Sequence, residues 1–154
     1  MKKIKLFTDS SVNPQKKIGF GAYLILDDEN KSLEDLKEHI KIKKFEDTSS
    51  TKLELQTLLW ALDEIINKDN IIEVYTDCQN IIGLENRKEK LEKRHFLDNK
   101  LYEQFFIKLK QLNLVFIKVK GHKKSGLKDE IDNIFNLVDK ASRKALREYI
   151  TYLK

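Results

Sequence analysis

The stretch LFTD, residues 6–9, has a near twin in VYTD, residues 74–77. Each is a short run of strand-forming residues that ends in Thr and then Asp, so both predict a strand followed by a carboxylate. An aspartate in this position often only ends a strand or caps a helix. If the two strands are parallel neighbours, Asp9 and Asp77 project from one edge of a sheet, where functional groups gather in α/β proteins.

The chain around this pair predicts a mixed α/β fold. Its first half predicts three strands in an antiparallel meander, with SSVNPQKK, residues 10–17, as the first turn. Its second half alternates strands with helices, which implies parallel pairing through crossovers. The strands are expected at residues 4–8, 19–26, 39–45, 71–76 and 114–119, and the helices at residues 48–66, 78–84, 101–112 and 130–149.

The composition suits one globular domain over residues 1–154. Hydrophobic residues make up 40% of the chain and charged residues 36%, as in a soluble protein with one core. The formal net charge of +5 is compatible with a phosphate-rich partner, although many Lys-rich proteins bind no anion. Cys78 is the only cysteine, which favours the reducing cytoplasm. We expect a monomer. We expect no membrane association, because no segment resembles a secretory signal or a membrane span.

Two further carboxylates are expected on the inward faces of helices. At about 100° per residue, Glu54 shares a helix side with Leu58, and Asp139 shares one with Phe135 and Ser142. Acidic groups so close together raise one another's pKa and are costly to bury. The predicted cluster of four carboxylates therefore requires a cation.

Two kinds of cation are compatible with this cluster. Arg143 lies four residues after Asp139, and an ordinary surface ion pair explains that spacing. The alternative is a divalent metal, and Mg²⁺ prefers a site made only of oxygen ligands. No Cys and His spacing supports zinc.

The remaining polar landmark is VKGHKKSG, residues 119–126. A single histidine in a loop is more often inert than catalytic. His122 follows the last predicted strand, however, where the sheet edge would bring it near the acidic cluster. We therefore include His122 among the candidate catalytic residues.

Together these motifs resemble those of the type I ribonuclease H family, in the family's order and approximate spacing. The match extends from Ile4 to about Arg147. Each motif alone is a weak signal, whereas the ordered set is specific. The motifs are FTDSS with Asp9, GFGAYL at residues 19–24, LELQTLLWAL with Glu54, YTDCQ with Asp77, VKGH with His122 and NLVDKASRKAL with Asp139.

The resemblance implies a ribonuclease H-like fold, in which helices flank a five-stranded mixed sheet whose first three strands are antiparallel. It also implies endonucleolytic hydrolysis of the RNA strand of RNA/DNA hybrids with two Mg²⁺ ions, for which Mn²⁺ is a possible substitute. The expected products carry 5′-phosphate and 3′-hydroxyl ends. In this scheme Asp9 bridges the two ions, and Glu54, Asp77 and Asp139 complete the ligand set. His122 moves protons or helps the product to leave.

The resemblance also implies contacts with nucleic acid. Ser50 and Thr51 stand where the family often has two asparagines that contact the RNA minor groove, and small hydroxyls can still hydrogen-bond a 2′-OH. Ser10 stands where the family usually has Gly, and Cys78 replaces a common Ser. Further contacts are expected from Ser11, Asn13 and Gln79.

A charge-rich run, ENRKEKLEKRHF at residues 85–96, takes the chain position of a Trp-rich basic protrusion found in some relatives. Most runs of this kind are only solvated helix faces. Because this run lacks tryptophan, we expect it to grip the DNA strand by charge alone. The cations expected to do so are Lys88, Lys90, Lys93 and Arg94.

Two other functions are compatible with the same fold. One is a related nuclease that acts on DNA or structured nucleic acid, such as a resolvase or a transposase-like enzyme. The other is a hybrid-binding module without catalysis. The histidine motif favours ribonuclease H over the first alternative, and the unbalanced inward carboxylates, which would only destabilise a binding module, argue against the second.

Overall fold

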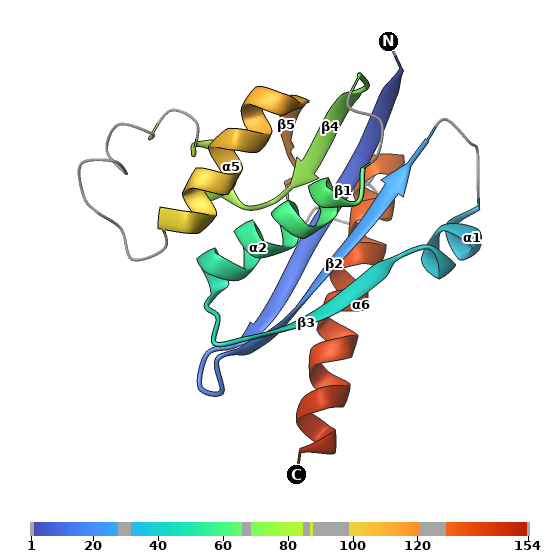
Figure 1. Ribbon diagram of the computed structural model, residues 1–154. Helices are drawn as coiled ribbons and strands as arrows, with labels where there is room; N and C mark the ends of the chain where they lie inside the picture. Colours follow the sequence, from blue (N-terminus) through green and yellow to red (C-terminus); the bar gives the residue numbers. More distant parts are fainter. Residues whose placement is uncertain are drawn as a thin grey trace.

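The computed structural model describes residues 2–27, 32–65, 69–84, 87, 99–120 and 129–153. One five-stranded sheet, with strand order β3-β2-β1-β4-β5, organises these residues (Figure 1). The strands are β1 (Lys3–Asn13), β2 (Ile18–Leu26), β3 (Lys41–Glu46), β4 (Ile71–Thr76) and β5 (Asn113–Lys118). The helices are α1 (Leu33–Glu38), α2 (Ser50–Asp63), α3 (Gln79–Ile82), α5 (Asn99–Gln111) and α6 (Glu130–Tyr152).

The strand pairing confirms the predicted mixed sheet. β1 pairs antiparallel with β2, and β2 pairs antiparallel with β3. β1 pairs parallel with β4, and β4 pairs parallel with β5. The first strand of the chain therefore lies at the centre of the sheet.

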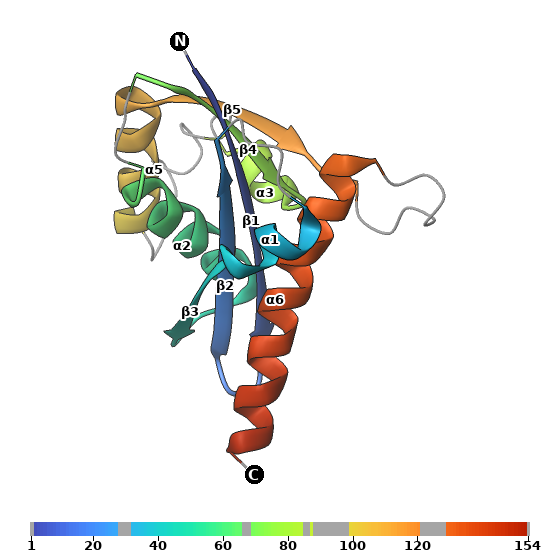
Figure 2. The same cartoon turned by 90° about the vertical axis from the view of Figure 1, so that its right-hand side faces the viewer.

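Helices cover both faces of the sheet, as Figure 2 shows. α2 and α5 pack on one face, where Leu6 of β1 lies in a buried cluster with Leu58 and Phe105. α6 packs on the opposite face, where Phe7 of β1 lies in a second buried cluster with Val138. Alternate residues of β1 thus face different helices, as the period of a strand requires.

Two glycines of β2 allow α2 to lie close to the sheet. A Cβ atom on Gly21 would overlap Thr57 Oγ1 and lie 2.9 Å from Thr57 Cγ2. A Cβ atom on Gly19 would overlap the side chain of Leu53 and lie 2.8 Å from the carbonyl oxygen of Ser11. Any side chain at these positions would hold α2 further from the sheet.

The structure differs from the sequence prediction in two elements. β1 does not end at residue 8, because Ser10 to Asn13 pair with β2, and the predicted turn shortens to residues 14–17. A short helix, α1, interrupts the predicted meander between β2 and β3. Ser32 caps this helix by accepting a hydrogen bond from the backbone N–H of Asp35.

Of the helices that the structure describes, none combines the length and the apolar composition that a membrane crossing requires.

Candidate active site

The candidate active site lies where β1 continues beyond β4. Parallel pairing between these strands stops at Phe7 and Tyr75, whereas β1 remains paired with β2 as far as Asn13. Asp9 lies on this continuing stretch, and Asp77 follows the last residue of β4. The two aspartates thus meet at the carboxyl end of the parallel pair, although Asp9 lies within its strand and not after it.

Three carboxylates converge at this point. One carboxylate oxygen from each of Asp9, Glu54 and Asp77 lies within 4.8 Å of the other two. Asp9 and Glu54 are buried, while Asp77 is exposed. The cluster therefore has a buried floor and an open side.

Glu54 comes from the first half of α2, and its two carboxylate oxygens have different surroundings. Ser10 Oγ donates a hydrogen bond to Glu54 Oε1 at 2.6 Å. Glu54 Oε2 is buried and accepts no hydrogen bond from any described residue. A buried carboxylate oxygen without a donor, beside two other carboxylates, fits a hard divalent cation with oxygen ligands.

Asp139 approaches the cluster from α6. A side-chain hydrogen bond between Asp139 and Asp9 is among the causes that raise the pKa of Asp9. Arg143 binds the carboxylate of Asp139 through both oxygens, with Nε–Oδ1 at 2.9 Å and Nη2–Oδ2 at 2.5 Å. The ion pair suggested by their spacing is therefore present, and Asp139 also lies beside Asp9.

The electrostatics of the cluster favour protonated carboxyl groups when no cation is bound. Burial raises the pKa of Asp9 well above its usual range, and Asp139, Glu54 and Asp77 raise it further. Burial also raises the pKa of Glu54 to about 7, although the hydrogen bond from Ser10 lowers it. A bound divalent ion would replace these protons, since metal binding requires the deprotonated ligands.

The raised pKa values predict that the metal-free protein loses stability as the pH rises. Between the ordinary carboxyl pKa of about 4 and the raised values, the native state holds more protons than the unfolded chain, so the free energy of unfolding falls. We expect a decrease of about 1–3 kcal/mol between about pH 5 and pH 8, restored by millimolar Mg²⁺. Urea unfolding with EDTA and with Mg²⁺ measures both effects.

Glu54→Gln provides the control for that measurement, since it removes one of the titrating groups. Its free energy of unfolding in EDTA should depend less on pH than that of the wild type. A wild-type protein whose stability rises over the same pH range would contradict the electrostatic account.

Comparison with known proteins identifies the family. A family model described as RNase H matches residues 1–146. The chain belongs to the RNase H family. Two curated relatives, both named Ribonuclease H, come from Clostridium botulinum strain Hall and from a second type A strain of that species. Each is 28% identical over 150 residues, which covers 88% of this chain and 95% of the relative. Membership of the RNase H family supports the conclusion that the protein is a nuclease, which is a class of hydrolase.

The described residues of this RNase H family member that are predicted to contact nucleic acid lie on β1, α2 and α3. Ser50 and Thr51 are exposed on the first turn of α2, and Gln79 is exposed at the start of α3. Ser11 lies on β1, with its Oγ 3.0 Å from Ser142 Oγ. The roles of these residues in binding nucleic acid stay predictions.

The amide oxygen of Asn13 accepts a hydrogen bond from the backbone N–H of Lys16, so this side chain helps to close the turn between β1 and β2. The other predicted site residues lie outside the described part of the chain. They are His122, Lys88, Lys90, Lys93 and Arg94.

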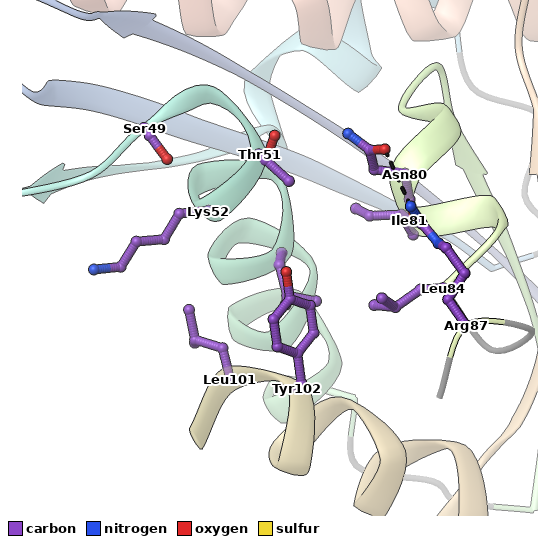
Figure 3. Close-up of a pocket in the computed structure, with 10 residues that line it drawn as sticks. Ser49, Thr51, Lys52, Asn80, Ile81, Leu84, Arg87, Leu101 and Tyr102 are labelled. Carbon is purple, nitrogen blue, oxygen red and sulfur yellow. Dashed lines mark hydrogen bonds between the residues drawn. The ribbon is translucent and has the colours of Figure 1, made fainter. Parts of the chain in front are cut away.

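A pocket of about 240 Å³ lies between the start of α2, α3 and the start of α5 (Figure 3). Lys52, Arg87 and Tyr102 contribute charged and polar groups to its lining. Arg87 is held in place, because its guanidinium group donates to the carbonyl oxygens of Gly83 and Asn80. The pocket therefore has a fixed positive charge.

Sequence reasoning missed two features of this RNase H site. It noted Ser10 only as a departure from the family motif, although the alternation of a strand directs residue 10 to the face opposite Asp9, where α2 lies. It also gave no role to Lys52, and it counted Arg87, 35 residues further along the sequence, only among the cations of the charge-rich run at residues 85–96. No local pattern brings them together.

Proposed function

We propose that the protein hydrolyses the RNA strand of RNA/DNA hybrids as a metal-dependent endonuclease, giving 5′-phosphate and 3′-hydroxyl ends. The observation that carries this proposal is the convergence of Asp9, Glu54 and Asp77, with a buried oxygen of Glu54 that has no donor among the described residues. Family membership supports the substrate, as do the names of the two relatives.

The carboxylates of this chain would hold the divalent ions, in our proposal two Mg²⁺, with Mn²⁺ as a possible substitute. When bound, such a pair activates the attacking water and stabilises the leaving oxygen. Asp9, Glu54 and Asp77, whose ligand oxygens lie within 4.8 Å of one another, would hold these ions. Their buried floor keeps the ligands fixed, and the open side admits a phosphodiester.

Two residues have proposed roles beside the cluster. Asp139 lies next to Asp9 and is held by Arg143, so it would complete the ligand set from the opposite face of the sheet. His122 would move a proton or help the product to leave, as the family motif VKGH implies.

The hybrid would bind along the face that carries these groups. Ser11, Asn13, Ser50, Thr51 and Gln79 are proposed to contact it through hydroxyl and amide groups. Contacts to the DNA backbone are assigned to the charge-rich segment, through Lys88, Lys90, Lys93 and Arg94.

We also propose that the protein works as a monomer in the cytoplasm. Its single cysteine supports a reducing compartment, because the chain cannot form an internal disulfide.

Incubation with a panel of labelled nucleic acids tests the proposed function. We expect cleavage of the RNA strand of a hybrid in Mg²⁺ or Mn²⁺, and no cleavage in EDTA, because the carboxylates alone supply no electrophile. Duplex DNA, duplex RNA and both single strands serve as the comparison substrates. Cleavage of DNA would favour the related nuclease, and hybrid binding without any cleavage would favour the binding module.

A further inference from the structure

Two adjacent serines on β1 connect this strand to the helices on opposite faces of the sheet. Ser10 Oγ donates to Glu54 Oε1 of α2 at 2.6 Å. Ser11 Oγ lies 3.0 Å from Ser142 Oγ of α6, and Ser142 Oγ also donates to the carbonyl oxygen of Asp139. The side chain of Ser10 therefore points away from Asp139 and toward Glu54.

The contact between Ser10 and Glu54 gives the two oxygens of the Glu54 carboxylate different surroundings. A glutamate side chain has a broad range at its last torsion, so a carboxylate without a partner rotates and exchanges its oxygens. Here Oε1 accepts the hydroxyl hydrogen bond, while Oε2 is buried with no donor from the described residues. The hydroxyl thus fixes which oxygen of Glu54 is left without a donor.

The backbone around Ser10 is fixed by the same elements that hold α2. Ser10 pairs directly with Gly21 of β2, the glycine against which Thr57 of α2 packs. Thr57 lies one turn after Glu54 and donates to the carbonyl oxygen of Leu53. Close packing therefore holds α2 against β2, and the Ser10 hydroxyl holds the carboxylate of Glu54, which lies on α2.

We propose that Ser10 is a positioning residue, which holds the Glu54 carboxylate so that Oε2 is available to a divalent ion. This inference rests on the proposed function, because it assumes that Glu54 is a metal ligand. Ser10 itself does not bind the ion. Its effect is on the affinity for the ion and not on contacts with the nucleic acid.

Calorimetric titration of Mg²⁺ into the protein without nucleic acid tests this inference. Ser10→Ala and Ser10→Gly both remove the hydroxyl, and we expect each to weaken Mg²⁺ affinity by about 10-fold or more, the effect typical of losing a residue that orients a metal ligand. Ser32→Ala is the control, since it removes a serine hydroxyl that caps α1, and it should leave the affinity unchanged.

Kinetics with the hybrid provide the second readout. In both Ser10 variants the Mg²⁺ concentration that gives half-maximal cleavage should rise in parallel with the Mg²⁺ Kd, while KM for the hybrid at saturating Mg²⁺ stays unchanged. Mg²⁺ affinity within twofold of the wild type in both variants would overturn the inference. A higher hybrid KM with unchanged Mg²⁺ affinity would overturn it too, by placing Ser10 on the substrate.

The two measurements separate this inference from the proposed function. A wild-type protein that binds Mg²⁺ but cleaves no nucleic acid would overturn the proposed activity, while the titration would still decide the role of Ser10. Wild-type protein with no Mg²⁺ affinity would overturn both.

Discussion

Replacement of Asp9 by Asn is expected to abolish hybrid cleavage while leaving the fold intact. The amide has nearly the shape of the carboxyl group but lacks the negative charge that holds a divalent ion. Asp9 is 4% exposed and belongs to the carboxylate cluster, where the charge it loses is one that would hold the ion. Single-turnover cleavage of a labelled hybrid at saturating Mg²⁺ measures the loss.

The same variant should be more stable than the wild type in the absence of metal. Burial and, after it, the neighbouring carboxylates raise the pKa of Asp9 and so oppose its ionisation, and the amide removes this cost. We expect the free energy of unfolding in EDTA at about pH 8 to rise by about 1–3 kcal/mol, because unfolding of the wild type releases the proton that burial keeps on Asp9, and the variant has no such proton to release. A variant that is more stable but inactive would show that Asp9 serves the reaction and not the stability of the fold.

Asp47→Asn is the matched control. Asp47 is exposed, and its φ of 52° suits asparagine as well as aspartate. This exchange should preserve cleavage and change the free energy of unfolding by less than about 0.5 kcal/mol. Cleavage by Asp9→Asn at the wild-type rate would show that the reaction takes place elsewhere.

Replacement of Gly21 by a larger residue is expected to have the largest effect on stability. A Cβ atom there would overlap Thr57 Oγ1, and Thr57 is fully buried. Thr57 cannot turn away freely, because its hydroxyl donates to the carbonyl oxygen of Leu53. Gly21→Ala should lower the free energy of unfolding by about 1–3 kcal/mol, and Gly21→Val should lower it further.

Two further variants test whether the overlap with Thr57 causes the loss of stability. Gly83→Ala is the control, since its Cβ atom would lie 3.6 Å from the nearest atom at an ordinary φ of −87°, and it should have little effect. Thr57→Ala removes Oγ1 and Cγ2, the two atoms nearest to the new Cβ, so adding it to Gly21→Ala should recover part of the lost stability. Additive losses in urea unfolding would contradict the close approach of α2.

The sequence was sufficient to predict the fold and the main features of the carboxylate site. The predicted mixed sheet is confirmed. It could be predicted because the parallel strands have strong strand signals and are joined by regular crossovers. Glu54, placed by helical periodicity, and Asp77, placed by its position at the end of a strand, both lie beside Asp9. The catalytic roles of all these residues stay predictions.

Features that depend on distant pairings were not accessible from local patterns. Ser10 to Asn13 have turn-forming composition, yet pairing with β2 extends the strand through them. Helix α1 buries only Leu36, so the sequence has no amphipathic period there to indicate it. The contact of Ser10 with Glu54 joins residues 44 positions apart and required the three-dimensional structure.

The central position of β1 has a consequence for biosynthesis. This strand is synthesised before the other strands of the sheet, yet one of its faces is covered by α6, and the contact between Ser11 and Ser142 spans 131 positions. Contacts of such long sequence separation slow folding, because the chain loses entropy before they form. The nascent chain therefore exposes one apolar face of its central strand until α6 has been synthesised, and Asp139 can join Asp9 only then.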